Sequence, residues 1–382
     1  MRIAIFENIM TPGGHEVDFD RILVEELTKL GHEVSFYVPE GFCFALDYHV
    51  PVHTLRGAVV SYHDVRGVHR LMRTAARELR RLSWYRQLAA LASAGAFDAL
   101  ILPTSTYRYL RALAQSRLRR SPVPVLFILH GINPHEAPKF LRAAARLAPF
   151  PAIRPTVLTF SQSIFGETAP NVRYLYPPTF VPRDIDWRPA AGQRLAPDAP
   201  ITIGFFGQYR REKRLRDFLE AYFAGHYTRP VRLLVQGSTM HPEDAEDFER
   251  IIGEYVGRGG VTFLHKGLIG ADWQRAIAGV DALLMPYSAP RYRYHWGGML
   301  FTAIGFEKPV VASDDMNPEV FAAYPIGRTF PSGDLGALKA ALEEFINTFD
   351  ERQPQYAAAL AQAAATYSPA NFARGIAAIL AQ

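Results

Sequence analysis

Two runs of alternating strands and helices constrain this chain of 382 residues more than any other feature. In the first run, apolar segments flanked by turn residues predict buried strands, and amphipathic segments between them predict helices. These strands are RIAIFEN, GHEVSFYVP, DALILP (98–103), VPVLFILH (123–130) and TVLTFS (156–161). Alternation of this kind favours a parallel sheet with helices on both faces. We therefore expect an α/β protein.

A second run of the same kind follows a proline-rich stretch. Residues 177–200 carry proline at a density that no helix or central strand tolerates. Beyond them, ITIGFFG, VRLLVQGS, VTFLHKG, ALLMPYS and KPVVASD predict strands, with helices expected at 215–224, 243–256 and 271–279. Two strand–helix runs predict two Rossmann-like domains that face a cleft, where ligands bind at the carboxyl ends of the strands.

The domain limits follow from this pattern. We expect an amino-terminal domain at 1–181, a linker at 182–200 and a carboxyl-terminal domain at 201–366. Ser368 and Pro369 make a good N-cap and first-turn pair for a last helix within 367–382. We expect that helix to pack back on the first domain.

Cysteine content and apolar runs bound the cellular context. The single cysteine, Cys43, excludes an intramolecular disulfide and fits a reducing cytosol. The apolar start of the chain is interrupted by Glu7 and Pro12 too early for a signal peptide, and no apolar run approaches the length of a membrane span. A cytoplasmic protein is expected, either soluble or peripheral at the inner face of the membrane.

Positive charge is concentrated in the first half of the chain. The formal net charge is +5, and residues 1–181 hold 21 Lys and Arg against 14 Asp and Glu, so that half carries +7 and the rest −2. Residues 61–120 hold 12 Arg against Asp64, Glu78 and Asp98. Such a patch is typical of proteins that meet a polyanion or an anionic surface.

Within this patch the spacing predicts an amphipathic basic helix. Its apolar residues are Val68, Leu71, Met72, Ala75, Leu79 and Leu82, and its other face holds Arg66, Arg70, Arg73, Arg77, Arg80 and Arg81. One interpretation packs the apolar face on its own domain and leaves the arginines in solvent. The other places Arg66–Arg86 against anionic lipid headgroups. Nucleic acid is not expected, because no recognised fold or stacking platform accompanies the patch.

Three loops at predicted carboxyl ends of strands suit a diphosphate: Thr11–His15, Gly207–Lys213 and Tyr287–Met299. Glycine pairs at 13–14 and 297–298 allow close backbone approach, and the second pair precedes a short helix whose first amides would point at a phosphate. Arg210, Arg211 and Lys213 would neutralise its charge. The alternatives are an ordinary strand-to-helix turn and a solvated helix start.

His130 ends an apolar strand and precedes Gly131, so it is either a cleft residue or a structural histidine. The chain has no Gly-x-Gly-x-x-Gly after the first strand, no Walker loop, no Gly-x-Ser-x-Gly elbow and no Cys/His metal spacing. Neither a bound cofactor nor a metal is therefore expected.

Together these loops resemble the two-domain GT-B glycosyltransferases, specifically family 4. The glycine loop followed by a helix and GHEV is similar to the family opening, and FILHG is similar to its acceptor-side strand. GFFGQYRREKRLRDFLEAY resembles the donor-diphosphate segment, with Lys213 matching and Gln208 where Arg is usual. Alignment on KPVVASD places Tyr294 and Thr302 where the family has two Glu, so this chain lacks both carboxylates.

The resemblance implies site residues as well as a fold. It implies that Gly298 and Met299 offer amides to the distal phosphate, that Thr302 bonds the ribose, and that Arg291, Arg293 or His295 replaces the lost sugar contacts. It assigns His130 to the catalytic position. The implied donor-binding residues are Gly13, Gly14, Gln208, Arg210, Lys213, Leu268, Tyr294, His295, Trp296, Gly297, Gly298, Met299 and Thr302.

The implied activity is metal-independent transfer of a sugar, with retention, from a nucleotide diphosphate to a glycan or lipid-linked acceptor of the cell envelope. One alternative is a GT-B-shaped scaffold that lost its chemistry with the two Glu. The other is an epimerase that converts UDP-N-acetylglucosamine without an acceptor.

Overall fold

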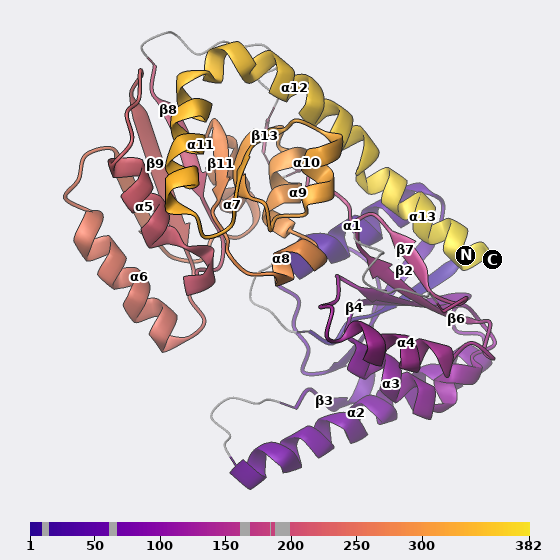
Figure 1. Cartoon of the computed structure of the whole chain (residues 1–382). Coiled ribbons are helices and arrows are strands. Elements are labelled where there is room, and N and C mark those ends of the chain that lie inside the picture. The colour runs from indigo at the N-terminus through magenta and orange to yellow at the C-terminus, as the bar shows by residue number, and fades with distance from the viewer. Residues whose placement is uncertain (10–14, 61–66, 161–168, 184, 188–198) are drawn as a thin grey trace. The chain divides into compact units, whose positions relative to one another are not determined.

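The computed structural model describes residues 1–9, 15–60, 67–160, 169–183, 185–187 and 199–382 (Figure 1). The predicted glycines Gly13 and Gly14, Arg66 and most of the predicted linker lie outside these ranges. The chain forms two compact units, one of residues 1–177 with 369–382 and one of residues 178–368.

The first unit is built on a seven-stranded sheet in the order β3-β2-β1-β4-β5-β6-β7, and every pair of neighbours is parallel. Its strands are β1 (Arg2–Phe6), β2 (Glu33–Glu40), β3 (Val52–Ala58), β4 (Ala99–Ser105), β5 (Val125–Leu129), β6 (Ile153–Leu158) and β7 (Arg173–Leu175). This arrangement confirms the predicted parallel α/β sheet.

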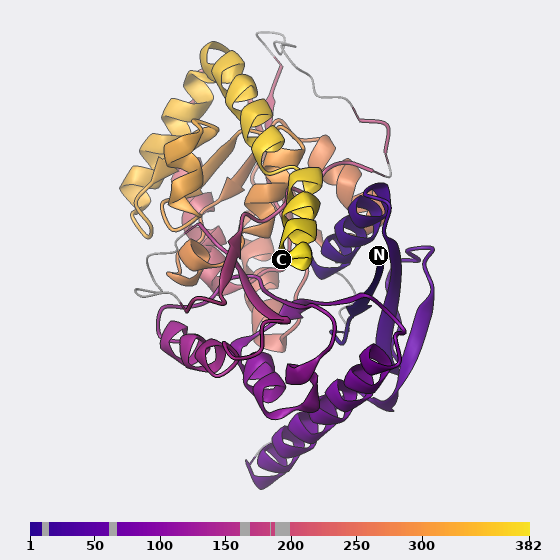
Figure 2. The ribbon, with the colours of Figure 1, turned by 90° about the vertical axis from the view of Figure 1, so that its right-hand side faces the viewer.

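Helices cover both faces of this sheet. They are α1 (His15–Lys29), α2 (Gly67–Ser93), α3 (Tyr107–Gln115), α4 (Ala137–Ala145) and α13 (Pro369–Ala381). Helix α13 contacts α1, β5 and β7. Helices α1 and α13 lie together on one side of the sheet (Figure 2). The other face holds a continuous core in which Phe6, Leu100 and Phe127 meet the buried residues of α2, α3 and α4.

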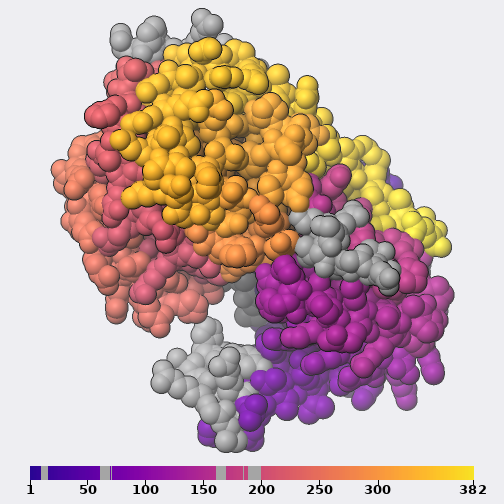
Figure 3. Space-filling model, viewed as in Figure 1, coloured from indigo at the N-terminus to yellow at the C-terminus, as the bar shows by residue number. Residues whose placement is uncertain are grey.

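The second unit has a six-stranded parallel sheet in the order β10-β9-β8-β11-β12-β13. Its strands are β8 (Ile201–Phe205), β9 (Val231–Gly237), β10 (Val261–His265), β11 (Ala282–Met285), β12 (Val310–Ser313) and β13 (Gly327–Phe330). Its helices are α5 (Leu215–Phe223), α6 (Pro242–Tyr255), α7 (Gly270–Ala278), α8 (Arg291–Tyr294), α9 (Gly298–Gly305), α10 (Pro318–Ala323), α11 (Leu335–Asn347) and α12 (Phe349–Thr366). In the space-filling view, α11 and α12 form the yellow surface of this unit (Figure 3).

Local chemistry explains where these helices begin. Helix α6 starts with Pro242, which needs no hydrogen bond at that position, and has Glu243 and Asp244 in its first turn near the positive end of the dipole. In α11 the carboxylate of Asp334 caps the helix by accepting from the Ala337 amide at 2.9 Å. The predicted helices at 215–224, 243–256 and 271–279 correspond within one residue to α5, α6 and α7.

Two details of the strand prediction were wrong. The strand expected at 156–161 runs from Ile153 to Leu158, with Pro155 opposite Phe127, since a parallel partner on each side and a buried position outweigh the low strand preference of proline. The strands β3, β7 and β13 were missed. All three lie at sheet edges, where short or partly polar segments can pair on one side only.

Helix α2 forms as predicted, but its predicted orientation was wrong. Leu71, Met72 and Leu79 from the predicted apolar face are 71%, 64% and 68% exposed. The helix instead packs on the domain through residues on its opposite side, including Arg81, Trp84, Tyr85 and Leu88, all buried.

A buried arginine is the reason for this orientation. The guanidinium of Arg81 donates to both carboxylate oxygens of Glu78 at 2.8 Å and lies 3.6 Å from the centre of the Tyr109 ring. Trp84 donates from its ring nitrogen to the Gly57 carbonyl at 3.0 Å. A paired and stacked guanidinium can be buried, so Arg81 is part of the packing face and not of a solvated one.

Candidate functional site

The clearest candidate site of the second unit lies at the carboxyl end of β8. The backbone turns there at Gly207, whose φ of +99° suits glycine. The amine of Lys213 lies beneath this turn, 3.3 Å from the position that a Cβ atom would take on Gly207. Lys213 is 9% exposed, donates to the Phe206 carbonyl at 3.3 Å and lies 4.7 Å from the centre of the Tyr287 ring.

The surroundings of Lys213 disfavour the charged form of its amine. Burial, with the nearby Arg210 and Arg291, lowers the pKa of the Lys213 amine from 10.5 to about 7. All three effects disfavour its charged form, whereas a bound phosphate would favour it. At neutral pH the free amine is therefore only partly protonated, and a bound anion would increase the protonated fraction.

Glu212 partly neutralises the surrounding arginines. Its carboxylate pairs with Arg291, accepts from the Tyr292 hydroxyl at 3.2 Å and lies 3.9 Å from an Arg210 guanidinium nitrogen. These contacts join the loop after β8 to the segment 291–297. The sequence motifs drew attention to the cations of this loop, and the balancing carboxylate between them was missed.

Asn317 holds the segment before α9 in place. Its side-chain oxygen accepts from the Gly297 amide at 3.1 Å, and its nitrogen donates to the carbonyls of His295 at 3.0 Å and Tyr292 at 3.3 Å. Asn317 is 2% exposed and has a φ of 40°. A Cβ atom on Gly297 would lie 2.7 Å from the Asn317 oxygen, so this glycine is required for the close packing.

The first amides of α9 are only partly available. The Gly297 amide is bound by Asn317, and the Gly298 amide donates to the Trp296 carbonyl at 3.0 Å. Met299 lies in the first turn, where an amide has no acceptor within its own helix. Of the two amides implied for the distal phosphate, that of Gly298 is already bonded within the chain, and the role of Met299 stays a prediction.

Two further predicted residues contribute packing in this structure. The Thr302 hydroxyl donates to the Gly298 carbonyl at 2.9 Å, and the residue is 4% exposed. Trp296 stacks on Phe180 with ring centres 4.8 Å apart and is 8% exposed. Tyr294 and His295 are half-buried in the segment that Asn317 holds, and Leu268 is half-buried after β10.

Gln208 replaces the arginine usual in the resembled motif. Its side-chain oxygen accepts from Arg210 at 3.4 Å, and its buried Nε2 atom has no hydrogen-bond partner among the described residues. Gln236, at the end of β9, was missed. It accepts from the Gly207 amide at 2.9 Å and so fixes the turn above Lys213. The polar Gln-Gly pair that ends the apolar strand VRLLVQGS was the available signal.

In the first unit, His130 and Glu7 follow the ends of β5 and β1. The Nε2 atom of His130 donates to the Pro103 carbonyl at 2.9 Å, and its ring meets Phe19 edge-on with centres 4.5 Å apart. Glu7, 2% exposed, accepts through Oε1 from the amides of Asn8 and Ile9 at 2.6 Å. Its Oε2 atom is buried without a hydrogen-bond partner in the described part of the chain.

Burial raises the pKa of Glu7 from 4.5 to about 8, against the opposing effect of the two amides. Because the unfolded chain releases this proton near pH 4.5 and the folded chain keeps it to about pH 8, stability should fall as the pH rises through that interval. In Glu7→Gln we expect this fall to shrink by about 2–4 kcal/mol between pH 5 and pH 8. Denaturant melts at both pH values measure it.

Glu40→Gln, at the exposed end of β2, is the matched control and should leave the pH dependence of wild type unchanged. Asp20 is also buried, and burial together with Glu7 raises the pKa of its carboxyl. If the unfolding free energies of wild type and Glu7→Gln change equally between pH 5 and pH 8, Glu7 is ionised in the folded protein and the prediction is wrong.

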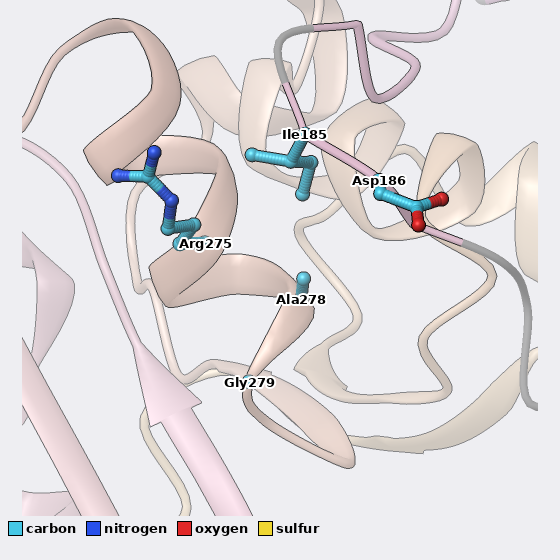
Figure 4. A pocket seen from close by; sticks show the side chains of 5 residues that line it. All are labelled: Ile185, Asp186, Arg275, Ala278 and Gly279. Atoms are coloured by element: carbon cyan, nitrogen blue, oxygen red, sulfur yellow. The ribbon is translucent and has the colours of Figure 1, made fainter.

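A pocket of about 540 Å³ lies elsewhere in the second unit, lined by Ile185, Asp186, Arg275, Ala278 and Gly279. The side chains of Arg275 and Asp186 point away from each other (Figure 4), and Arg275 pairs with Asp272 at 2.8 Å. None of the predicted site residues lines it. Among the described residues, no group of three or more His, Cys, Asp and Glu side chains is placed to hold a metal ion.

Residues 200–348 match the family model described as Glycosyl transferases group 1, and this range covers the sheet and the site around Lys213. The second unit is a glycosyltransferase group 1 domain. This match confirms the predicted glycosyltransferase, whereas family 4 stays a prediction. A search of curated protein sequences found no match to the chain.

Solved structures of glycosyltransferases share the fold of the whole chain. HepE from Anabaena, in complex with UDP and glucose, is 18% identical, with a TM-score of 0.67 and coverage of 100% of this chain and 99% of its own. Sucrose-phosphate synthase from Thermosynechococcus elongatus is 16% identical, with a TM-score of 0.68 and coverage of 100% and 98%. The lipopolysaccharide outer core galactosyltransferase WaaB is 15% identical, with a TM-score of 0.62 and coverage of 100% and 99%. These likenesses confirm the GT-B fold.

The described part of this glycosyltransferase contains no helix that combines the length and the apolar character of a membrane span.

Proposed function

We propose that this glycosyltransferase moves a sugar from a nucleotide diphosphate to a glycan or lipid-linked acceptor. The observation that carries the proposal is the buried amine of Lys213 beneath the Gly207 turn, within the glycosyltransferase group 1 domain. A buried cation that an anion would stabilise suits the diphosphate of such a donor.

In the proposed reaction, charge grows on the diphosphate as the glycosidic bond breaks. Lys213, Arg210 and the Met299 amide stabilise that charge, and preorganised groups of this kind favour the transition state over the ground state. His130, in the first unit, contacts the donor sugar or the acceptor. The reaction is proposed to be metal-independent and to retain configuration, as the resemblance implies.

The neighbours support the nature of the substrates. HepE was solved with UDP and glucose, and WaaB is a lipopolysaccharide outer core galactosyltransferase. By analogy we propose a nucleotide-sugar donor, a cell-envelope or polysaccharide acceptor, and a cytoplasmic location that includes the inner membrane surface.

The scaffold alternative has one specific observation in its favour. Tyr294 and Thr302 stand in place of the two family Glu, and the Thr302 hydroxyl is already bonded to the Gly298 carbonyl. Donor turnover separates a scaffold from an enzyme, and conversion of UDP-N-acetylglucosamine without an acceptor would identify an epimerase.

Thermal shifts with UDP, GDP, ADP, TDP and CMP test the proposal. Ligand at 100 times its dissociation constant should stabilise the protein by about 2.7 kcal/mol, and we expect one diphosphate to do so. The matching sugar nucleotides then enter a hydrolysis and transfer assay. If no nucleotide shifts the melting curve, the proposed donor site is wrong and the scaffold alternative stands.

A further inference from the structure

Helix α2 presents an apolar stripe to solvent. The outer stripe consists of Leu71, Met72, Ala75 and Leu79, all exposed. Leu71 and Leu79 are the most exposed large hydrophobic side chains of the described chain, at 71% and 68%. Single exposed apolar residues are ordinary, but neighbouring ones on one helix mark an interaction surface.

The spacing of the outer stripe makes it continuous. Leu71, Ala75 and Leu79 follow one another at four-residue steps, so they lie on one side of the helix, and Met72 is one turn from Ala75 and two from Leu79. Trp84, Tyr85 and Leu88, on the opposite side, already supply the contacts with the domain core. The outer stripe is therefore not needed to hold α2 on its own domain.

The helix that carries this stripe is strongly basic. Helix α2 contains six Arg and a single acidic residue, Glu78, and that carboxylate is bound by the buried Arg81. Arg73 and Arg86 are exposed. The amino-terminal half of the helix extends beyond the rest of the first unit (Figures 1 and 2). The helix thus combines an exposed apolar stripe with a strongly positive net charge.

We propose that the outer stripe docks the protein on a lipid bilayer that contains anionic lipids. The helix lies along the interface with Leu71, Met72 and Leu79 among the acyl chains. Arg86, on the same side of the helix, reaches the headgroup phosphates, and Arg73, on the other side, adds to the attraction at a distance. A second copy of the chain fits less well, because two helices of high positive charge would meet. The sequence predicted that the arginine face of Arg66–Arg86 would meet the lipid headgroups. In this proposal the apolar residues of the outer stripe make the main contact instead.

Sedimentation with lipid vesicles tests this docking, and it does not depend on which sugar nucleotide the protein uses. The full chain is mixed with vesicles of phosphatidylcholine alone or with phosphatidylglycerol. We expect wild type to bind the anionic vesicles, and Leu71→Ser/Met72→Ser/Leu79→Ser to bind them at least tenfold less, at low and at high salt. Arg73→Ser/Arg86→Ser should lose affinity mainly at low salt, where charge is least screened.

The matched control is Val256→Ser, which changes an apolar side chain of similar exposure, 60%, at the end of α6. It should bind like wild type. Met72→Trp gives a second readout, because its emission should shift to the blue on contact with anionic vesicles. Equal binding by wild type and the triple variant would overturn the proposal, as would self-association of wild type that the triple variant abolishes without any vesicle binding.

Discussion

Raising the pH from 7 to 9 should weaken the binding of UDP, or of whichever diphosphate stabilises the protein, by about 50-fold. The buried amine of Lys213 has a pKa of about 7 before the ligand binds, so at pH 9 almost every molecule must take up a proton to form the charged contact. The terminal phosphate of the nucleotide, with a pKa of about 6, is already mostly ionised at pH 7, and its further ionisation would strengthen binding. The loss therefore reports the state of the protein.

Lys213→Met removes the charge and keeps the length of the side chain. We expect it to weaken binding by about 100-fold at pH 7, the size of a charge-assisted hydrogen bond, and to bind equally at pH 7 and pH 9. The variant should not lose stability. Below about pH 7 the lysine is charged in both states, and burying that charge lowers the stability of the fold. Between about pH 7 and pH 10 only the unfolded chain keeps the proton, so this destabilising contribution shrinks as the pH rises.

Titration calorimetry in two buffers of different ionisation enthalpy measures both affinity and proton uptake. Lys339→Met, on α11, is the control for the loss of a lysine and should behave like wild type. Constant affinity from pH 7 to pH 9 without proton uptake would mean that the diphosphate does not contact the Lys213 amine.

Removing the side chain of Asn317 should loosen the segment 292–297. We expect it to lower both the affinity for the nucleotide and the stability of the protein. Asn317→Gly tolerates the φ of 40° and deletes three hydrogen bonds, to Gly297, His295 and Tyr292. Because it leaves buried backbone groups without partners, we expect a loss of about 2–4 kcal/mol in unfolding free energy. UDP affinity should fall about tenfold or more, since the start of α9 is no longer fixed.

Asn347→Ala supplies the comparison. Asn347 also bonds backbone groups, accepting from the Thr228 amide at 2.8 Å and donating to the His226 carbonyl at 3.1 Å, but it lies at the end of α11. It should lower stability without changing UDP affinity. If Asn317→Gly lowers stability and leaves UDP affinity at the wild-type value, the segment 292–297 does not contribute to the donor site.

The central strands of both sheets could be predicted from the sequence because burial on two faces requires an uninterrupted apolar segment. VLFIL and VVAS show this pattern and became β5 and β12. The edge strand β7 has only three residues, none of them fully buried, and no such signal marks it. The orientation of α2 was missed for a related reason, since hydrophobic periodicity does not reveal that a guanidinium will be buried over Tyr109.

The site shows the same division. Lys213 and Gly207 lie side by side in a loop that the sequence had singled out, because the groups that place them are close in sequence. Asn317 and Gln236 act from 20 residues after Gly297 and 29 after Gly207, so the sequence around these glycines does not reveal their partners. The Gln-Gly pair after an apolar strand marks Gln236 only as a polar residue at a strand end. The resemblance also could not show that the Thr302 hydroxyl donates a hydrogen bond to the Gly298 carbonyl of its own helix.

The division of the chain has a consequence for the order of folding. Residues 178–368 are continuous, whereas the first unit is completed by residues 369–382, whose helix α13 contacts α1, β5 and β7. During synthesis, the second unit can therefore close its core while the earlier half of the chain still exposes the surface that α13 will cover. The first unit is therefore completed only after the second has been synthesised. Until then, Phe19 of α1 lacks its ring contact with Phe372 of α13.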